Sequence, residues 1–185
     1  MKVMNITTPH HALSVRSAQP SDFAAIERIE AAADQLFIEA FAPAHWPPAT
    51  PAVDRLEQGG FLLVGEACEA RGAEIVGFVH VLEAQDDRGS GIAHLEQVSV
   101  LPGHGKRGYG RALVEAAMRE ARGRGYAELT LRTYADLPWN APFYRGLGFT
   151  ETAPNCAFLM ELEDAERAEG LEQYGRRVQM TAPLT

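Results

Sequence analysis

The sequence predicts an α+β fold with a mixed, mostly antiparallel sheet of six to seven strands and helices on both faces. Two apolar, β-rich segments, residues 61–65 and 74–82, flank a turn-like stretch and predict an antiparallel hairpin. The next predicted strand, residues 92–100, leads through a glycine-rich loop into an amphipathic helix, and residues 127–133 form another strand. Strand, helix and strand in this order make a βαβ crossover, so we expect one parallel pair of strands.

Length and composition set the class of protein. With 185 residues, 46% of them hydrophobic, the chain is long enough for one domain with a sizeable core. A formal net charge of -8 disfavours nucleic acid and anionic membranes as partners. The two cysteines, Cys68 and Cys156, form no metal-binding or disulfide pattern, and we interpret both as structural. No secretory signal or membrane-length apolar run is found, so we expect a cytoplasmic protein. Because the cysteines form no metal-binding pattern, we expect no metal ion.

The N-terminal third is predicted to be mostly helical. We expect a flexible lead at residues 1–12 and a short strand at 13–16. A first helix is expected to begin at Ser21 or Asp22, and two further helical segments are expected at 34–41 and 53–58. Pro43 and the proline-rich loop after it end the segment at 34–41. Apolar residues about one turn apart give the first helix a face to bury, namely Phe23, Ile26, Ile29 and Ala33.

The strand at residues 92–100 contains a shift in its alternation of apolar residues. Ala93 and Leu95 share one parity, whereas Val98 and Val100 share the other. A β-bulge produces such a shift, and bulges are frequent beside active sites. A strand that is covered on both faces would give the same pattern, and the sequence leaves both interpretations open.

After the glycine-rich loop, the pattern again alternates between helix and strand. The helix has an apolar stripe at helical spacing, formed by Tyr109, Ala112, Leu113, Ala116, Ala117 and Ala121. Asn140 is placed to cap a short helix that ends near Gly148. A last strand is expected at about residues 156–162, and residues 164–185 are expected to form a charged tail that is weakly helical at best.

The glycine-rich loop predicts an anion-binding site. Four glycines lie within eight residues, at positions 103, 105, 108 and 110, and a helix begins directly after them. Glycine lets the backbone approach a ligand closely, and the unpaired N–H groups of a helix start favour phosphate. We therefore expect a phosphorylated cofactor. The loop also fits the dinucleotide pattern G-x-G-x-x-G, but a single βαβ unit argues against that fold, and no Gly-Lys-Ser/Thr sequence supports a P-loop.

These residues in this order resemble the GNAT superfamily of acyl-CoA-dependent N-acetyltransferases. The family's cofactor motif, Arg/Gln-x-x-Gly-x-Gly/Ala after a strand that ends in Val-x-Pro, is similar to the segment from Val100 to Gly110. Gly105 stands where the family has Arg or Gln, with Lys106 and Arg107 beside it. A second segment, Asn140 to Phe149, resembles the family's Asn-x-x-x-Tyr…Gly-Phe segment, with Tyr144 at its tyrosine. The resemblance covers roughly residues 15–163.

The resemblance implies an N-acetyltransferase domain at residues 13–163 with the GNAT fold, and acetyl-CoA as cosubstrate. It implies direct transfer of an acetyl group to an amine in a ternary complex, the acceptor being a small-molecule amine or a peptide. A homodimer is compatible with the family. The residues that it assigns to cofactor binding are Val98, Val100, Gly105, Lys106, Arg107, Gly108, Tyr109, Gly110, Arg111 and Asn140. A non-catalytic acyl-CoA sensor, or a subunit of a complex, is the alternative.

Glu96 and Tyr144 are the catalytic candidates. An alkylammonium has a pKa near 10.4, so the site must remove a proton from the amine before it can attack a thioester. Family members carry a carboxylate near Glu96, and a tyrosine near the cofactor sulfur, like Tyr144, suits protonation of the departing thiolate. His80, His94 and His45 are further candidates for the base, each more typical of a residue without a chemical role. The acceptor is expected near residues 24–53 and 150–155.

Overall fold

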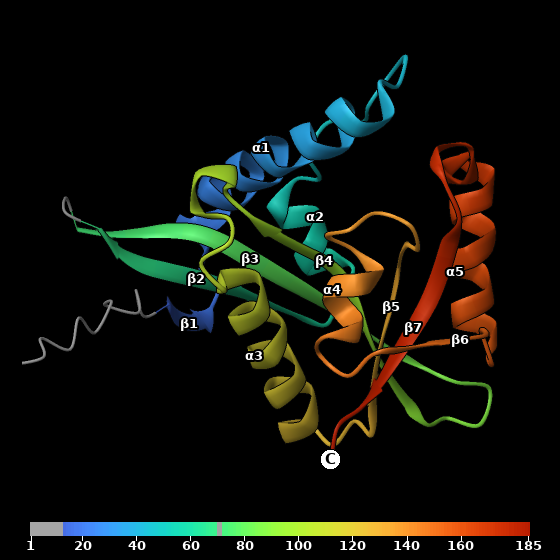
Figure 1. Ribbon diagram of the computed structural model, residues 1–185. Helices are drawn as coiled ribbons and strands as arrows, with labels where there is room; N and C mark the ends of the chain where they lie inside the picture. Colours follow the sequence, from blue (N-terminus) through green and yellow to red (C-terminus); the bar gives the residue numbers. More distant parts are fainter. Residues whose placement is uncertain (1–12, 70–71) are drawn as a thin grey trace, which may run out of the picture.

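The computed structural model describes residues 13–69 and 72–185, so the lead predicted at residues 1–12 lies outside the described part (Figure 1). The elements are β1 (Leu13–Ser17), η1 (Pro20–Asp22), α1 (Phe23–Phe41), α2 (Ala52–Glu57), β2 (Phe61–Glu69), β3 (Gly72–Gln85), β4 (Gly91–Val100), η2 (Pro102–His104), α3 (Tyr109–Gly123), β5 (Glu128–Tyr134), α4 (Ala141–Arg145), β6 (Thr150–Thr152), α5 (Ala157–Ala168), η3 (Leu171–Tyr174) and β7 (Arg177–Pro183). The described strands form one sheet in the order β1-β2-β3-β4-β5-β7-β6.

The sheet is antiparallel except at its centre, where β4 and β5 run parallel. Only Ala93–Leu95 of β4 pair with Leu129–Leu131 of β5, and beyond these residues the two strands separate. The other described pairs of strands are all antiparallel. The predicted α+β class and its single crossover are confirmed, and the sheet is not the doubly wound type that the dinucleotide pattern requires.

Helices cover both faces of the sheet. On one face, α3 and α4 contribute Leu113 and Tyr144 to a core that includes alternate residues of β4 and β5, such as Leu95 and Leu131. On the other face, α1 packs Ile26 and Ile29 against apolar residues of β2 and β3. The same second face carries α5, because its Phe158 contacts the ring of His94 and its Glu166 binds Arg132. Figure 1 shows α1 and α5 separated on this face.

A β-bulge interrupts β4 next to the point where β4 and β5 separate. His80 of β3 pairs with Gln97, and Val81 pairs with Leu95, so Glu96 is the extra residue. Of the two interpretations of the 92–100 pattern, the bulge is confirmed. The bulge places Ala93 and Val98 on the same face of the sheet, although their parity differs.

The N-terminal helical prediction needs one correction. The helix that begins near Asp22 and the separate piece at 34–41 are one continuous helix, α1. No glycine or proline interrupts residues 23–41, and Ala31, Ala32 and Ala33 at the junction favour a helix. Asp22 lies just before this helix without a side-chain cap. Its carboxylate instead accepts a hydrogen bond from the backbone N–H of Gln19 and pairs with Arg16 at 2.6 Å.

The C-terminal prediction is wrong in two respects. Residues 156–162 are not a strand, because α5 occupies 157–168, and its Leu159 is buried on one helical face. The segment predicted as a charged tail instead contributes β7, which lies between β5 and β6 within the sheet. Alternate residues of β7 are buried in the core, namely Val178, Met180 and Ala182. This period of two is the signal of a strand, although the flanking arginines obscure it.

Candidate active site

The glycine-rich loop adopts a conformation that glycine favours. The chain leaves β4 at Val100, makes the short turn η2 and enters α3 from Gly108, whose φ is 83°. Lys106 has a φ of 60°, one of two positive values at a non-glycine residue in the described part of the chain. A left-handed conformation costs a residue with a Cβ atom about 1–2 kcal/mol, and strain of this kind is concentrated at functional sites.

The loop presents backbone donors to a cavity of about 460 Å³. The first N–H of α3 with a backbone acceptor belongs to Ala112, which donates to the carbonyl of Gly108 at 3.0 Å. The N–H groups of residues 109–111 have no backbone acceptor in the described ranges. A Cβ atom built on Gly108 would meet nothing within 4 Å, so the space beside it is open to a ligand. Unpaired N–H groups, a helix N-terminus and Lys106 together suit a phosphate group.

Most of the residues predicted to bind the cofactor line this cavity. They are Val100, Gly105, Lys106, Gly108, Tyr109, Gly110 and Arg111. Arg107 is not among the lining residues. The Tyr109 side chain is 2% exposed within a small apolar cluster, and the Arg111 guanidinium binds the carbonyl of Gly146 at 3.0 Å.

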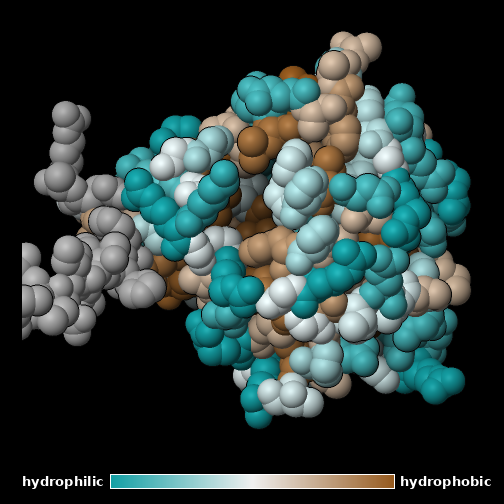
Figure 2. Space-filling model, viewed as in Figure 1, coloured by the Kyte–Doolittle hydropathy of each residue, from teal (hydrophilic) through white to brown (hydrophobic). Residues whose placement is uncertain are grey.

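A second cavity, of about 190 Å³, continues from the first toward the gap between β4 and β5. The two cavities share four lining residues, which are Val100, Gly110, Trp139 and Phe143. Val98 and Asn140, both predicted from the sequence, line the second cavity as well. Figure 2 shows apolar surface along the middle of this side of the molecule, bordered by hydrophilic residues. A long molecule with a phosphate at one end and an apolar arm would fit both cavities.

Tyr144 lies at the inner end of the second cavity. Its ring packs edge-on against Phe143 and Phe149, and only 9% of the residue is exposed. Burial raises the pKa of Tyr144 well above the usual value near 10, because the phenolate would lose its hydration. The hydroxyl therefore keeps its proton at neutral pH and can serve as a donor. Asn140 occupies the N-cap position of α4, but its side chain makes no capping hydrogen bond.

Glu96, the bulged residue, lines a third cavity of about 270 Å³ on the other face of the sheet. Gln97 lines both the second and the third cavity, so the two adjoin at the bulge. The Glu96 side chain keeps 39% of its exposure, yet the cavity walls displace enough water to raise the pKa of its carboxyl above the ordinary value. A raised pKa makes Glu96 a stronger base once it is ionised.

His94 lies beside Glu96, with 4.0 Å between Nε2 and the nearer carboxylate oxygen. Burial lowers the pKa of His94 to about 4, so the ring is neutral at pH 7 and the contact is not an ion pair. Thr130 donates its hydroxyl to the carbonyl of Ala93 and therefore accepts from His94 Nδ1 at 2.9 Å. This network assigns the proton to Nδ1 and leaves a lone pair on Nε2.

The other candidate histidines, and the two cysteines interpreted as structural, lie elsewhere. His80 is 1% exposed, contacts the carbonyl of Gly59 through Nε2 at 3.3 Å and has a pKa lowered to about 4 by burial. His45 is exposed in the loop between α1 and α2 and lines none of the three cavities. Cys68 is exposed and Cys156 buried, both as free thiols.

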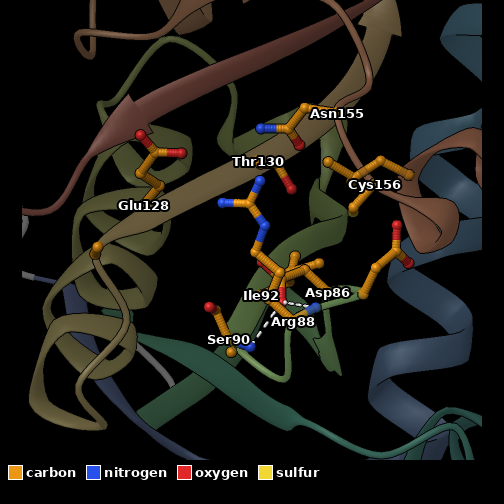
Figure 3. Close-up of a pocket in the computed structure, with 12 residues that line it drawn as sticks. Asp86, Arg88, Ser90, Ile92, Glu128, Thr130, Asn155 and Cys156 are labelled. Carbon is orange, nitrogen blue, oxygen red and sulfur yellow. Dashed lines mark hydrogen bonds between the residues drawn. The ribbon is translucent and has the colours of Figure 1, made fainter.

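A larger hollow, of about 530 Å³, lies at the far end of the sheet (Figure 3). It contains none of the residues predicted for catalysis or cofactor binding, and Asn155 is its one lining residue from the segments where we expected the acceptor. Asp86 there accepts hydrogen bonds from the backbone N–H groups of Arg88 and Ser90, at 2.8 and 2.7 Å, which closes the β3–β4 turn. No group of three or more His, Cys, Asp or Glu residues in the described ranges could hold a metal ion. No helix in those ranges is long and apolar enough to cross a bilayer.

Sequence reasoning missed some of the lining residues. Trp139 is 43% exposed and lines both of the first two cavities, and Asp34 and Phe37 of α1 line the second. The only sequence signal for Trp139 was that a large apolar residue stands in a short loop just before Asn140. Asp34 and Phe37, by contrast, lie in the segment where we expected the acceptor, and their residue types suit an amphipathic amine, although the same composition suits ordinary helix packing.

A cleft that begins at a glycine-rich helix start and ends between two parting parallel strands, beside a buried tyrosine, is the arrangement of a protein that binds an acyl-CoA. The model of the acetyltransferase (GNAT) family matches residues 26–149. The chain belongs to this family, as the resemblance of its motifs implied.

Solved structures with the same fold are numerous. The ribosomal-protein-S18-alanine N-acetyltransferase from Escherichia coli is 22% identical, with 94% of this chain and 95% of that chain covered and a TM-score of 0.61. A GNAT family acetyltransferase from Brucella melitensis, in complex with acetyl-CoA, is 24% identical over 76% and 84% of the chains, with a TM-score of 0.55. The NatC complex bound to Gag peptide and CoA contains a chain that is 16% identical, over 94% and 99%, with a TM-score of 0.69. At identities below 25%, these similarities show a shared fold and nothing further about function.

Proposed function

We propose that the protein is an N-acetyltransferase that moves an acetyl group from acetyl-CoA directly to an amine acceptor. The observation that carries the proposal is the separation of β4 from β5 beyond Leu95 and Leu131. It leaves the β4 edge at Val98 and Val100 without a partner strand on the β5 side, and those two residues line cavities that connect the glycine-rich loop with Tyr144.

In this proposal, the first two cavities hold acetyl-CoA. The backbone N–H groups of residues 109–111 and the Lys106 side chain would bind the pyrophosphate. The edge of β4 would pair with the pantetheine arm in the manner of an added strand. Lys106 supplies a cation near the position where the family has Arg or Gln and this chain has Gly105. Trp139 and Phe143 line both cavities and provide apolar surface where the two cavities meet.

Glu96 and Tyr144 then divide the proton transfers between them. The amine nitrogen attacks the thioester carbon, the new N–C bond forms and the C–S bond breaks. The proton of the amine passes to Glu96, directly or through a water molecule, and Tyr144 gives its hydroxyl proton to the departing thiolate. The N–H of Val98 would stabilise the negative charge on the carbonyl oxygen during the attack. Glu96 reaches the reaction from one face of the sheet, and Tyr144 from the other.

The first experiment is calorimetric titration of the protein with acetyl-CoA, with NADH as the control ligand. Micromolar binding of acetyl-CoA but not of NADH supports the cofactor assignment. A screen of amines that includes small amines and an alanyl peptide follows, with release of free thiol as the readout. Binding without amine-dependent thiol release would favour the non-catalytic acyl-CoA sensor, and absence of binding would overturn the proposal.

A further inference from the structure

The wall of the second cavity that α1 provides contains an acidic group held in place by an indole. The Trp46 Nε1–H donates to Asp34 Oδ2 at 3.1 Å, across the loop that follows α1. Phe37, one turn after Asp34, stacks on Trp46, with 5.9 Å between the ring centroids and 8° between the planes. Asp34 and Phe37 both line the cavity in which Tyr144 lies. Asp34 and Phe37 therefore form one surface beside the proposed reaction centre, and Trp46 contacts both of them from behind.

Asp34 has no cationic partner of its own. Its Oδ1 accepts no hydrogen bond, and neither oxygen forms an ion pair, within the part of the chain that the structure describes. The guanidinium whose charge acts on Asp34, that of Arg55, has a side chain that is 4% exposed and is bound by Glu30 at 2.6 Å. A partly buried carboxylate without a cation is costly unless a ligand supplies the charge.

The adjoining third cavity also has more carboxylates than guanidiniums in its lining. Four carboxylates and two guanidiniums line the second and third cavities together. The two guanidiniums, Arg132 and Arg177, are both bound to Glu166. Glu96, like Asp34, forms no ion pair with a lysine or arginine in the described ranges. The fourth carboxylate, Glu169, is likewise without an ion pair in the described ranges, but it is exposed at the end of α5. Asp34 on α1 and Glu96 on β4 are thus the two uncompensated carboxylates that border the space where an acceptor would lie.

We propose that Asp34, oriented by Trp46, binds a second ammonium group of the acceptor, so that the preferred substrate class is a diamine or polyamine. Glu96 would take the proton from the amino group that is acetylated, and Asp34 would hold the group that stays charged. The Phe37–Trp46 pair adds aromatic surface that attracts cations. The inference rests on the proposed function for the reaction, but the binding of a dication to Asp34 can be tested without turnover.

The binding test uses calorimetry on the full chain saturated with CoA, which cannot transfer an acetyl group. The probes are diamines of three to five carbons, with n-butylamine as the monocation. We expect the best diamine to bind at least tenfold more tightly than n-butylamine, which equals about 1.4 kcal/mol. Asp34→Asn should remove this preference, because the amide still accepts from Trp46 but carries no charge. Glu39→Gln, which removes an exposed charge from the same helix, should keep it.

The kinetic test compares kcat/KM for the same amines with acetyl-CoA. The diamine preference should appear mainly in KM, and it should fall to near unity in Asp34→Asn. Equal affinity for n-butylamine or an alanyl peptide, or a diamine affinity that Asp34→Asn changes less than twofold, would overturn the inference and leave the proposed reaction intact. Diamine binding that depends on Asp34 without acetyl transfer would uphold the subsite and overturn the reaction.

Discussion

His80 and Gln97 face each other across β3 and β4, and the next pair along these strands passes over Glu96. The extra residue places Glu96 at the point where the parallel pairing of β4 and β5 has just ended. A regular strand would orient alternate residues to opposite faces, whereas the bulge directs Glu96 into the third cavity and Val98 into the second. The bulge therefore brings the proposed base and the proposed cofactor-binding edge together within three residues.

Replacing the proposed base should slow the reaction most above the pKa of Glu96, where the wild-type carboxylate is ionised and can accept a proton. We expect Glu96→Gln to lower kcat/KM by about 10²-fold or more at pH 7, the range typical of a positioned base. Because burial raises the pKa of Glu96, the wild-type rate should rise with pH through a value above the ordinary carboxyl pKa. The variant should lack this rise and retain only the rise due to deprotonation of the free amine. Steady-state rates between pH 5 and 9 measure both profiles.

Glu169→Gln is the matched control, because Glu169 lines the same cavity from the exposed end of α5. It removes the same charge without touching the bulge, so the acidic limb should remain, shifted slightly to lower pH because the charge of Glu169 helps to raise the pKa of Glu96. A Glu96→Gln profile with an unchanged acidic limb would exclude Glu96 as the base.

Tyr144→Phe tests the proton donor. The phenyl ring can keep the edge-on contacts with Phe143 and Phe149, so the fold and the affinity for acetyl-CoA should change little. Loss of the hydroxyl should lower kcat by roughly tenfold or more, the low end of what a positioned acid contributes. Stopped-flow thiol release gives kcat, and calorimetry gives the affinity. Unchanged turnover would remove Tyr144 from the mechanism.

Gly108→Val tests the anion-binding loop. The side chain would enter the open space beside the helix start, and a φ of 83° strains any residue with a Cβ atom. We expect acetyl-CoA binding to be lost and the free energy of unfolding to fall by about 1–2 kcal/mol. Gly103→Val is the matched control, since a Cβ there also meets nothing within 4 Å, its φ is not positive, and Gly103 lies outside the lining of the cavity. Micromolar binding by Gly108→Val would mean that the ligand approaches elsewhere.

Local patterns predicted much of the fold and part of the site. The parity change between Leu95 and Val98 indicated a bulge because side chains alternate strictly along a strand. The glycines and the helix after them predicted the loop that borders the first cavity and that we propose binds phosphate, since its donors belong to the backbone of one short segment. The crossover followed from element order alone, because parallel strands need a connection that returns to the same edge.

Features that depend on distant contacts could not be predicted. Trp46 and Asp34 are 12 residues apart, and their hydrogen bond exists only because the proline-rich loop folds back along α1. The β7 strand begins at Arg177, whose partner Glu166 lies on α5, so this charge and that of Arg176 before it looked like those of a solvated tail. The apolar residues at the start of α5 form a short continuous run, from Ala157 to Met160, and such a run fits a strand as well as a helix.

Two buried neutral histidines should make the fold sensitive to mild acid. The pKa values of His80 and His94 are lowered from 6.5 to about 4 by burial, so both bind a proton more readily in the unfolded chain. Their contribution to stability is complete above pH 6.5 and declines as the pH falls toward 4, by up to about 3 kcal/mol per histidine. The raised pKa of Glu96 acts in the opposite direction, so variants are needed to isolate the histidine effect.

Urea unfolding at several pH values should show a shallower decline in His80→Gln and in His94→Gln than in the wild type, whereas His45→Gln, an exposed position, should match the wild type. Parallel curves for all four proteins would show that neither buried ring resists protonation in the folded state.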